Sequence, residues 1–144
     1  MKRVSTAIFP ESGVSSSATA DVLIVDDEPL IRWSLRRGLV KRGYRVAEAG
    51  DGAGALRELQ ADPGRFGVVV LDFRLPDSDD LSLLRAIRRL APTAAVLMMT
   101  AFGDRPMRTE AIALGARIVI DKPFQVSAVV ALVESPPPPT PPDA

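Results

Sequence analysis

The segment GVVVLD, residues 67–72, decides the fold class of this chain. Three valines and a leucine form an unbroken apolar run that is bounded by a glycine and an aspartate. β-Branched residues favour strands, and a strand without polar alternation is typical of a parallel sheet covered on both faces. The segment therefore predicts a central parallel strand that ends on Asp72.

Similar runs recur along the chain and alternate with segments of helical character. The other predicted strands are DVLIV (21–25), YRVAEA (44–49), AAVLMMT (94–100) and ARIVI (116–120). The predicted helices cover residues 29–42, 51–61, 79–90, 104–115 and 125–134. Apolar residues recur every fourth position in the first helix, and glycines follow the ends of the first and fourth. Five such units predict an α/β fold of the (βα)5 type, a doubly wound, five-stranded parallel sheet with helices on both faces and right-handed crossovers.

The overall composition excludes several functional classes. The 144 residues include 18 Lys plus Arg and 18 Asp plus Glu, so the formal net charge is zero. This balance disfavours direct binding of nucleic acid or of an anionic membrane surface. The sequence has no cysteine and no histidine, which excludes disulfides, thiolate zinc sites, histidine metal sites and Ser-His-Asp triads. We see neither a membrane span nor the apolar region of a signal peptide, and we expect a cytoplasmic protein.

Composition also divides the chain into three segments. Residues 1–20 are rich in Ser, Thr, Ala and Gly, and we expect a disordered leader. Residues 21–134 contain all the predicted strands and helices. The tail SPPPPTPPDA, residues 135–144, is too rich in proline for a helix or a sheet interior. We expect it to be an extended polyproline tail or linker.

Chemically useful side chains stand at the ends of the predicted strands. Asp26 and Asp27 follow the first strand, Asp72 ends the third, Thr100 ends the fourth and Lys122 follows the fifth. Functional groups of such sheets collect at the carboxyl ends of the strands, so we expect these five side chains to converge. Each alone has an ordinary explanation, such as a helix cap or a solvated loop. Their joint position at one edge is what indicates a site.

The chemistry of this set points to phosphoryl transfer. Crowded carboxylates repel one another and require a positive partner. Ligands that are all oxygen favour Mg²⁺, with Mn²⁺ as a second possibility, over zinc. Lys122 adds a fixed cation and Thr100 can donate a hydrogen bond. A carboxylate in such surroundings is equipped to attack a phosphoryl group, and the product would be an aspartyl phosphate on Asp72.

Four stretches resemble the receiver domain of bacterial two-component response regulators. They are VLIVDDEPLIRWSL (22–35), VVVLDFRLPDSDDL (68–81), LMMTAFGD (97–104) and LGARIVIDKPF (114–124). The first stretch is most similar to receivers attached to sigma-54-dependent activators. The resemblance implies a flavodoxin-like sheet with strand order 2-1-3-4-5.

The resemblance also implies a role for each residue of the site. Asp72 matches the phosphoacceptor, Thr100 the switch hydroxyl and Lys122 the lysine that contacts the phosphoryl group. Mg²⁺ would be held by Asp72, by Asp27 directly, by Asp26 through water and by the backbone carbonyl of Arg74. Pro123 matches a proline that often follows a cis peptide bond in this family.

The family mechanism further implies partners. A sensor histidine kinase or a phosphotransfer protein would supply the phosphoryl group, and the phosphorylated chain would present a changed surface to a downstream protein target or a fused output domain. The chain would not be an enzyme beyond its own phosphoryl transfer and dephosphorylation, and it would be a monomer or a weak dimer. A single-domain regulator and the receiver part of a longer protein both fit the sequence.

Several residues depart from the family pattern or add to it. Val119 stands where an aromatic residue is usual, Asp80 replaces a common glycine, and the last predicted helix is short. Arg74 and Phe102 occupy positions that in this family tune the access of water to the aspartyl phosphate. Because both are bulky, we expect slow loss of phosphate.

Other functions fit parts of the pattern. A phosphatase of the haloacid-dehalogenase type also uses a strand-end aspartate and Mg²⁺, but its nucleophile lies in a DxD pattern on the first strand. A phosphorylation-independent interaction module on the same fold is the main alternative, and the departures at Val119 and Asp80 favour it. Trp33, on the first helix, either docks a kinase helix or packs against the last helix of the chain.

Overall fold

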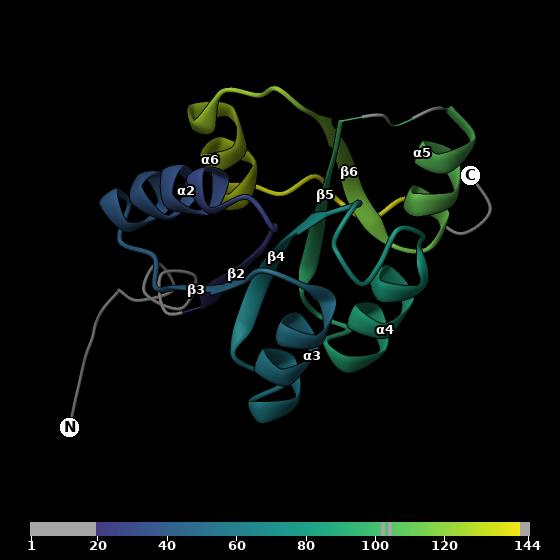
Figure 1. Ribbon diagram of the computed structural model, residues 1–144, viewed down its shortest axis with the longest axis horizontal. Helices are drawn as coiled ribbons and strands as arrows, with labels where there is room; N and C mark the ends of the chain where they lie inside the picture. Colours follow the sequence, from purple (N-terminus) through teal and green to yellow (C-terminus); the bar gives the residue numbers. More distant parts are fainter. Residues whose placement is uncertain (1–19, 102, 104, 142–144) are drawn as a thin grey trace.

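The computed structural model describes residues 20–101, 103 and 105–141, and they form a five-stranded parallel sheet (Figure 1). The strands are β2 (Asp21–Val25), β3 (Val46–Ala49), β4 (Phe66–Asp72), β5 (Ala95–Thr100) and β6 (Ala116–Asp121). Their order in the sheet is β3-β2-β4-β5-β6, with β4 in the centre. Numbered by order along the chain, this is 2-1-3-4-5, so the predicted topology is confirmed.

Helices cover both faces of the sheet. They are α2 (Pro29–Lys41), α3 (Gly52–Ala61), α4 (Ser82–Leu90), α5 (Arg105–Ala113) and α6 (Val126–Glu134). Figure 1 shows α2 and α6 on one side and α3, α4 and α5 on the other. Alternate residues of each strand point to opposite faces, so the core divides in two. Ile24 and Val70 pack towards α2 and α6, whereas Leu23 and Val69 belong to the cluster beneath the other three helices.

The ends of the helices largely follow the sequence signals. Pro29 is the first residue of α2, and Gly43 and Gly115 adopt positive φ values of 91° and 111° after α2 and α5. The prediction for α4 was wrong by three residues, since the helix begins at Ser82 rather than at residue 79. The preceding segment instead forms a loop, and the Asp80 carboxylate accepts hydrogen bonds from the backbone N–H and the hydroxyl of Ser82 at 2.9 and 2.6 Å.

Outside the helices and strands, the structure describes residues 135–141 of the predicted tail. Residues 136–141 form neither helix nor strand, and the carbonyl of Pro137 accepts a hydrogen bond from Arg117 of β6 at 3.0 Å. The predicted leader, except for Ala20, lies outside the described residues, as do Phe102 and Asp104. Among the described helices, none has the length and apolar character needed to cross a membrane.

Candidate functional site

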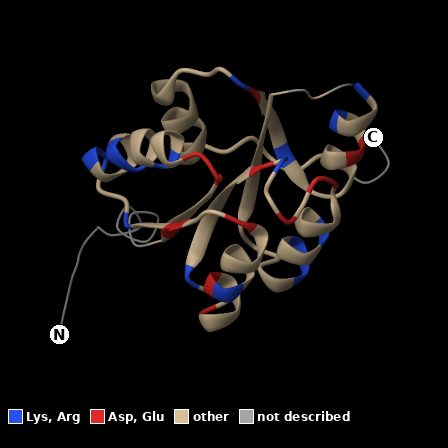
Figure 2. Cartoon of the chain, viewed as in Figure 1, with Lys and Arg blue, Asp and Glu red and all other residues tan. Residues whose placement is uncertain are grey.

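The candidate site lies where β2, β4, β5 and β6 end. Strand register places these ends side by side: Val25 pairs with Leu71, Asp72 with Met99, and Thr100 with Asp121. The Phe73 N–H donates to the carbonyl of Met99 at 2.8 Å, which keeps the chain after β4 close to β5. Figure 2 shows short acidic segments where β2 and β4 end, whereas basic residues mark outer turns of α2 and α4. The predicted convergence at this edge is therefore a consequence of the pairing of the strands.

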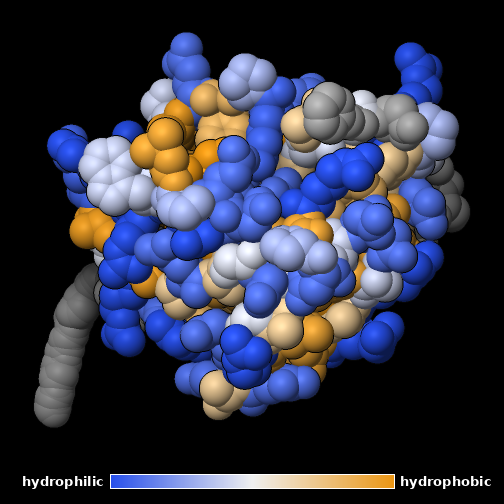
Figure 3. Space-filling view, viewed as in Figure 1, coloured by the Kyte–Doolittle hydropathy of each residue, from blue (hydrophilic) through white to orange (hydrophobic). Residues whose placement is uncertain are grey.

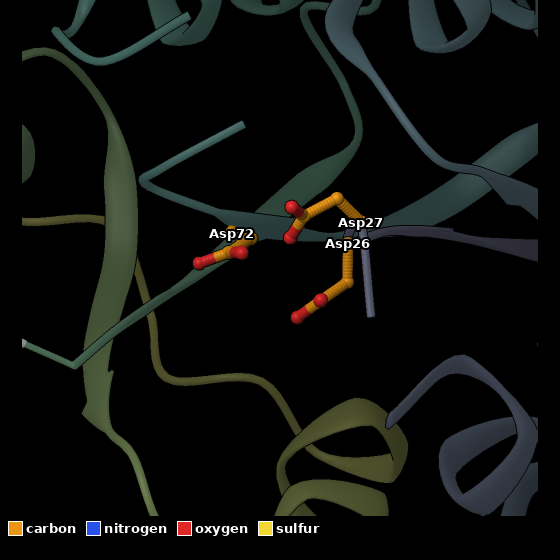
Figure 4. A group of neighbouring side chains, drawn as sticks. All are labelled: Asp26, Asp27 and Asp72. Atoms are coloured by element: carbon orange, nitrogen blue, oxygen red, sulfur yellow. The ribbon is translucent and has the colours of Figure 1, made fainter. Parts of the chain in front are cut away.

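Three carboxylates meet at this edge (Figure 4). One oxygen from each of Asp26, Asp27 and Asp72 lies within 4.8 Å of the others. Asp26 is fully buried and Asp72 is 5% exposed, whereas Asp27 is exposed. The Glu28 N–H donates to Oδ1 of Asp26 at 2.8 Å, which orients that carboxylate at the turn into α2. Two buried negative charges and a third beside them thus share one small space.

Lys122 is the cation that faces this cluster. Its Nζ lies 2.9 Å from Oδ2 of Asp26, 3.3 Å from Oδ2 of Asp72 and 3.1 Å from Oε1 of Glu28. The peptide bond from Lys122 to Pro123 is cis, as the resemblance implied. The Lys122 N–H donates to the carbonyl of Thr100 at 2.8 Å, so the lysine is held against the end of β5. Sequence reasoning missed Glu28, although its place directly after the acidic pair was a signal.

The crowding changes the proton affinities of the two central groups. Burial, reinforced by the charge of Asp26, raises the pKa of Asp72 from its ordinary value of 3.8 to about 6, against the opposing effect of Lys122. Burial alone would lower the pKa of Lys122, but its hydrogen bonds to Asp26 and Glu28 and the charge of Asp72 raise it well above the usual value. Lys122 therefore remains charged, while Asp72 titrates close to neutrality.

The donor set fits a divalent metal ion. All three converging groups are carboxylates, which are the ligands that Mg²⁺ and Ca²⁺ prefer. Around Asp26, Asp27 and Asp72 stands one lysine, so the cluster keeps an excess of negative charge. The backbone N–H of Arg74 donates to the Asp72 carboxylate, which brings the chain after β4 back towards the cluster. Whether the Arg74 carbonyl completes the metal site stays a prediction.

The structure places Thr100 at the same edge, buried at the end of β5. Val119, which stands where the family usually has an aromatic residue, is half-buried on β6. Arg108 of α5 lies against it. The Arg108 guanidinium donates to the carbonyl of Val119 at 3.2 Å and also binds the Asp121 carboxylate. Sequence reasoning missed this arginine, because only the packing of α5 on β6 brings the two together.

Sequence reasoning also missed Arg32, which supports the acidic pair from behind. Its Nη1 donates to the carbonyl of Asp26 at 2.6 Å and its Nε pairs with Glu48 of β3 at 3.1 Å. Arg32 therefore ties α2 to the ends of β2 and β3. The only available signal was its position one turn into the helix after the acidic pair, where a side chain can reach back to the preceding strand end.

The sequences of known proteins were compared with this chain. A family model described as response regulator receiver domain matches residues 22–134. The chemotaxis protein CheY of Thermotoga maritima is 37% identical over 113 residues, which cover 76% of this chain and 90% of that protein. The DNA-binding transcriptional regulator NtrC of Proteus hauseri is 38% identical over 117 residues, which cover 79% of this chain and 24% of that protein. The chain thus spans nearly all of one relative and about a quarter of the other.

Solved structures agree with this match. A response regulator from Burkholderia pseudomallei with a phosphorylated aspartic acid, a calcium ion and citrate has a TM-score of 0.73 and 30% identity, over 81% of this chain and 67% of that one. A CheX–CheY complex with BeF3 and Mg²⁺ from Borrelia burgdorferi has a TM-score of 0.74 and 27% identity, over 81% of this chain and 87% of that one. With the family model matching most of its length, the chain belongs to the response regulator receiver domain family.

Proposed function

We propose that Asp72 is the phosphoacceptor of this chain and that its phosphorylation switches the surface of the domain. Receiver domains are phosphorylation-dependent signalling switches, and the proposal assigns that role to named residues. The single observation that carries it is the position of Asp72, a buried carboxylate 3.3 Å from Lys122 and within 4.8 Å of two further carboxylates. A carboxylate that served only to end a strand would not need this environment.

The chemistry follows from the groups around Asp72. A carboxylate oxygen of Asp72 attacks the phosphorus of a phosphohistidine; the new P–O bond forms as the P–N bond breaks, and the imidazole leaves with the bonding pair. These 144 residues contain no histidine, so the phosphohistidine lies outside them, in our proposal on a sensor histidine kinase or a phosphotransfer protein. Lys122 neutralises charge on the transferred group. We further propose that Thr100, which is buried at the end of β5, moves towards the phosphoryl group and thereby changes the α5–β6 surface.

The same site holds the metal ion in our proposal. Asp26, Asp27, Asp72 and the carbonyl of Arg74 would hold Mg²⁺, or Mn²⁺ in its place. When bound, the ion supplies positive charge to the phosphoryl oxygens. Asp26 and Lys122 form a 2.9 Å pair that keeps both side chains oriented towards Asp72. The excess of carboxylates over cations at this edge supports the assignment.

Helix α2 offers a surface on which the phosphodonor can dock. The large apolar side chains that the described residues leave exposed are Leu30, Trp33 and Val40, and all lie on α2. A groove of about 460 Å³ lies between the start of α2 and the chain after β6, and its lining includes Leu30 and Lys122. Figure 3 shows apolar surface over α2 and α6. Trp33 is 55% exposed with Arg37 over its ring at 5.4 Å, which supports docking rather than packing against α6.

The experiment is phosphorylation by acetyl phosphate with Mg²⁺, followed by intact-mass analysis. We expect one added phosphoryl group that is labile in base and absent in Asp72→Asn. A protein that gains no mass would support the alternative, a phosphorylation-independent interaction module, which the valine at position 119 and the acid at position 80 favour. For the docking surface, Trp33→Ala is expected to slow phosphotransfer from a kinase while leaving both the melting temperature and acetyl phosphate labelling unchanged.

The remaining assignments are also part of the proposal. The switch spans residues 21–134, works in the cytoplasm as a monomer or weak dimer, and passes its signal to a protein target or to an output domain in the same chain. The bulk of Arg74, whose side chain is exposed, supports slow loss of phosphate. Measuring phosphate release from the wild type and from Arg74→Ala tests this point, since unchanged or slower release in the variant contradicts it.

A further inference from the structure

Helix α3 begins with two carboxylate caps, one from its own segment and one from a distant loop. Asp51 directly precedes the helix and accepts a hydrogen bond from the Gly54 N–H at 2.7 Å. Asp77 lies in the loop after β4 and accepts from the N–H groups of Gly52 and Ala53 at 2.8 and 3.0 Å, one with each carboxylate oxygen. The first cap is an ordinary local one. The second joins two loops that are far apart in the sequence.

The contact between Asp77 and α3 is close and specific. A Cβ atom at position 52 would lie 3.2 Å from Oδ1 of Asp77 and 3.1 Å from the Leu83 side chain, so the glycine at 52 allows this approach. The two backbone N–H donors lower the pKa of Asp77, which keeps the carboxylate charged. Hydrogen bonds from N–H groups to an ionised carboxylate are stronger than neutral ones. Asp77 therefore binds tightly to the first turn of α3.

On its own side, Asp77 is firmly connected to the chain that follows Asp72. Leu75 and Ser78 exchange backbone hydrogen bonds of 2.8 and 3.2 Å across a tight turn that contains Asp77. The Leu75 side chain is 7% exposed and belongs to the core. Directly before it, the Arg74 N–H bonds to the Asp72 carboxylate. The turn is thus rigid, and it begins one residue after the predicted carbonyl ligand.

On the other side, the start of α3 is connected to the acidic pair. The chain between β3 and α3 is only two residues long, and the carbonyl of Ala49, the last residue of β3, accepts a hydrogen bond from the Asp26 N–H at 3.1 Å. Strand β2 lies between β3 and β4 in the sheet, and α3 and α4 cover the same face (Figure 1). A bond between the loops after β3 and after β4 therefore spans the end of β2, where Asp26 and Asp27 lie.

We propose that Asp77 is a positioning residue that fixes the distance between the Asp72 loop and the acidic pair, and thereby sets the affinity of the site for its divalent metal ion. The inference rests on the proposed function, because it presumes that Asp26, Asp27 and Asp72 bind the ion. Residues that orient metal ligands from outside the coordination sphere commonly change metal affinity by one or two orders of magnitude.

The test is a titration of the purified chain with Mn²⁺, in which free Mn²⁺ is counted by electron paramagnetic resonance. For Asp77→Ala we expect about tenfold weaker binding, and for Asp77→Asn, which keeps one acceptor oxygen, a smaller loss. Two controls match the variant. Asp51→Ala removes the local cap of the same helix, and Asp79→Asn removes a charge from the same loop. Both are expected to stay within twofold of the wild type.

The outcomes separate the two proposals. If Asp77→Ala binds Mn²⁺ as tightly as Asp51→Ala and Asp79→Asn do, the positioning role is wrong and Asp77 only caps a helix. If the wild type itself takes up no Mn²⁺, the proposed metal site fails, and the role of Asp77 fails with it. Should Asp77→Ala not fold, the graded comparison of Asp77→Asn with Asp79→Asn decides, because these two variants lose the same charge from the same loop.

Discussion

Strand β2 begins and ends beside a buried aspartate, and the two carboxylates are neutralised in different ways. At the start, Asp21 is paired with Arg65 at 2.7 Å and with Arg45 at 3.5 Å. At the end, Asp26 shares Lys122 with Asp72. At the first position two arginines serve Asp21 and Glu58, which also contacts Arg65, whereas at the second Asp26, Asp72 and Glu28 all contact one lysine. Both aspartates are as inaccessible as apolar core residues, so burial alone does not distinguish them.

The difference distinguishes an end of β2 whose buried charge is balanced from an end whose buried charge is not. A buried charge is tolerated when its partners balance it, and at Asp21 the balance is complete. At Asp26 and Asp72 the balance is missing: burial raises the pKa of Asp72, the charge of Asp26 raises it further, and Lys122 offsets only part of the rise. Strongly perturbed groups of this kind cluster at functional sites. An incoming cation or a phosphoryl group with its metal ion can use the charge that the fold leaves uncompensated.

The largest loss of stability is expected for a substitution of Asp21, the aspartate at the start of β2. Asp21→Ala removes the buried carboxylate that accepts a charged hydrogen bond from Arg65 at 2.7 Å and pairs with Arg45, and we expect the free energy of unfolding to fall by about 3 kcal/mol. Urea denaturation measures this change. Acetyl phosphate labelling should remain intact in the variant, because the opposite end of β2 is untouched. A variant as stable as the wild type would mean that Asp21 and the arginines contribute nothing, and the contrast between the two ends would be lost.

Asp72→Asn, in contrast, is expected to increase the free energy of unfolding. The folded state raises the pKa of Asp72 to about 6, so it binds more protons than the unfolded state between pH 4 and 6. Stability is therefore lost as the pH rises through this range, and at pH 7 the metal-free protein carries the full cost of the charged form. We expect the variant to be more stable than the wild type by about 2 kcal/mol at pH 7.5.

A pH series provides the control for this variant. The stability difference between Asp72→Asn and the wild type should vanish near pH 4 and reach its maximum above pH 7. Added Mg²⁺ should reduce it by stabilising the wild type alone. A variant less stable than the wild type at pH 7.5 would show that Lys122 balances Asp72 fully.

A smaller effect, on the pKa of Asp72, is expected when Lys122 is replaced. In Lys122→Gln, Asp72 loses a positive charge at 3.3 Å, so its pKa should rise further, by about one unit, or ~1.4 kcal/mol. Carboxyl-carbon NMR of the metal-free protein follows this titration, with the wild type expected near pH 6. The carboxylate of Asp77, which is bound by the N–H groups of Gly52 and Ala53, serves as an internal reference. A pKa of Asp72 that stays unchanged in the variant would mean that burial and the charge of Asp26 set it without Lys122.

The smallest effect is expected at Glu28. Its carboxylate also contacts Lys122, at 3.1 Å, but the side chain is 59% exposed. Solvent screens such a pair, and we expect Glu28→Gln to change the free energy of unfolding by less than about 0.5 kcal/mol. Labelling by acetyl phosphate should also stay within about twofold. A much larger change in labelling would place Glu28 in the site itself rather than at its rim.

Most of the fold could be predicted from the sequence. Unbroken apolar runs such as residues 67–72 indicate strands buried on both faces, and alternation with helices leaves the parallel sheet as the solution. The first residues of β3 and α4 were harder to predict: we expected residues 44 and 79, whereas the strand begins at Val46 and the helix at Ser82. Asp79 and Asp80 are typical of a helix start, but the turn from Leu75 to Ser78 delays the helix until Ser82.

The residues of the site likewise fall into those that could be predicted from the sequence and those that could not. Asp26, Asp27, Asp72, Thr100 and Lys122 could be predicted because each stands at a strand end, and parallel strands bring their ends together. Arg32, Asp77 and Arg108 could not be assigned, because only the folded chain brings their partners close. Glu28 was missed although it directly follows the acidic pair. The reach of Asp77 to the start of α3 depends on how two loops pack, and no local pattern records that.

By itself, the sequence determined which elements form and which chemical groups stand at their ends, because hydrophobic pattern and residue type act locally. The tertiary structure alone decided how charge is shared among those groups. Proton affinity depends on the distance to other charges and on burial, and both arise only when distant strands are placed side by side. Asp21 and Asp26 are both buried aspartates beside β2, and their surroundings differ because different cations reach them in the folded chain.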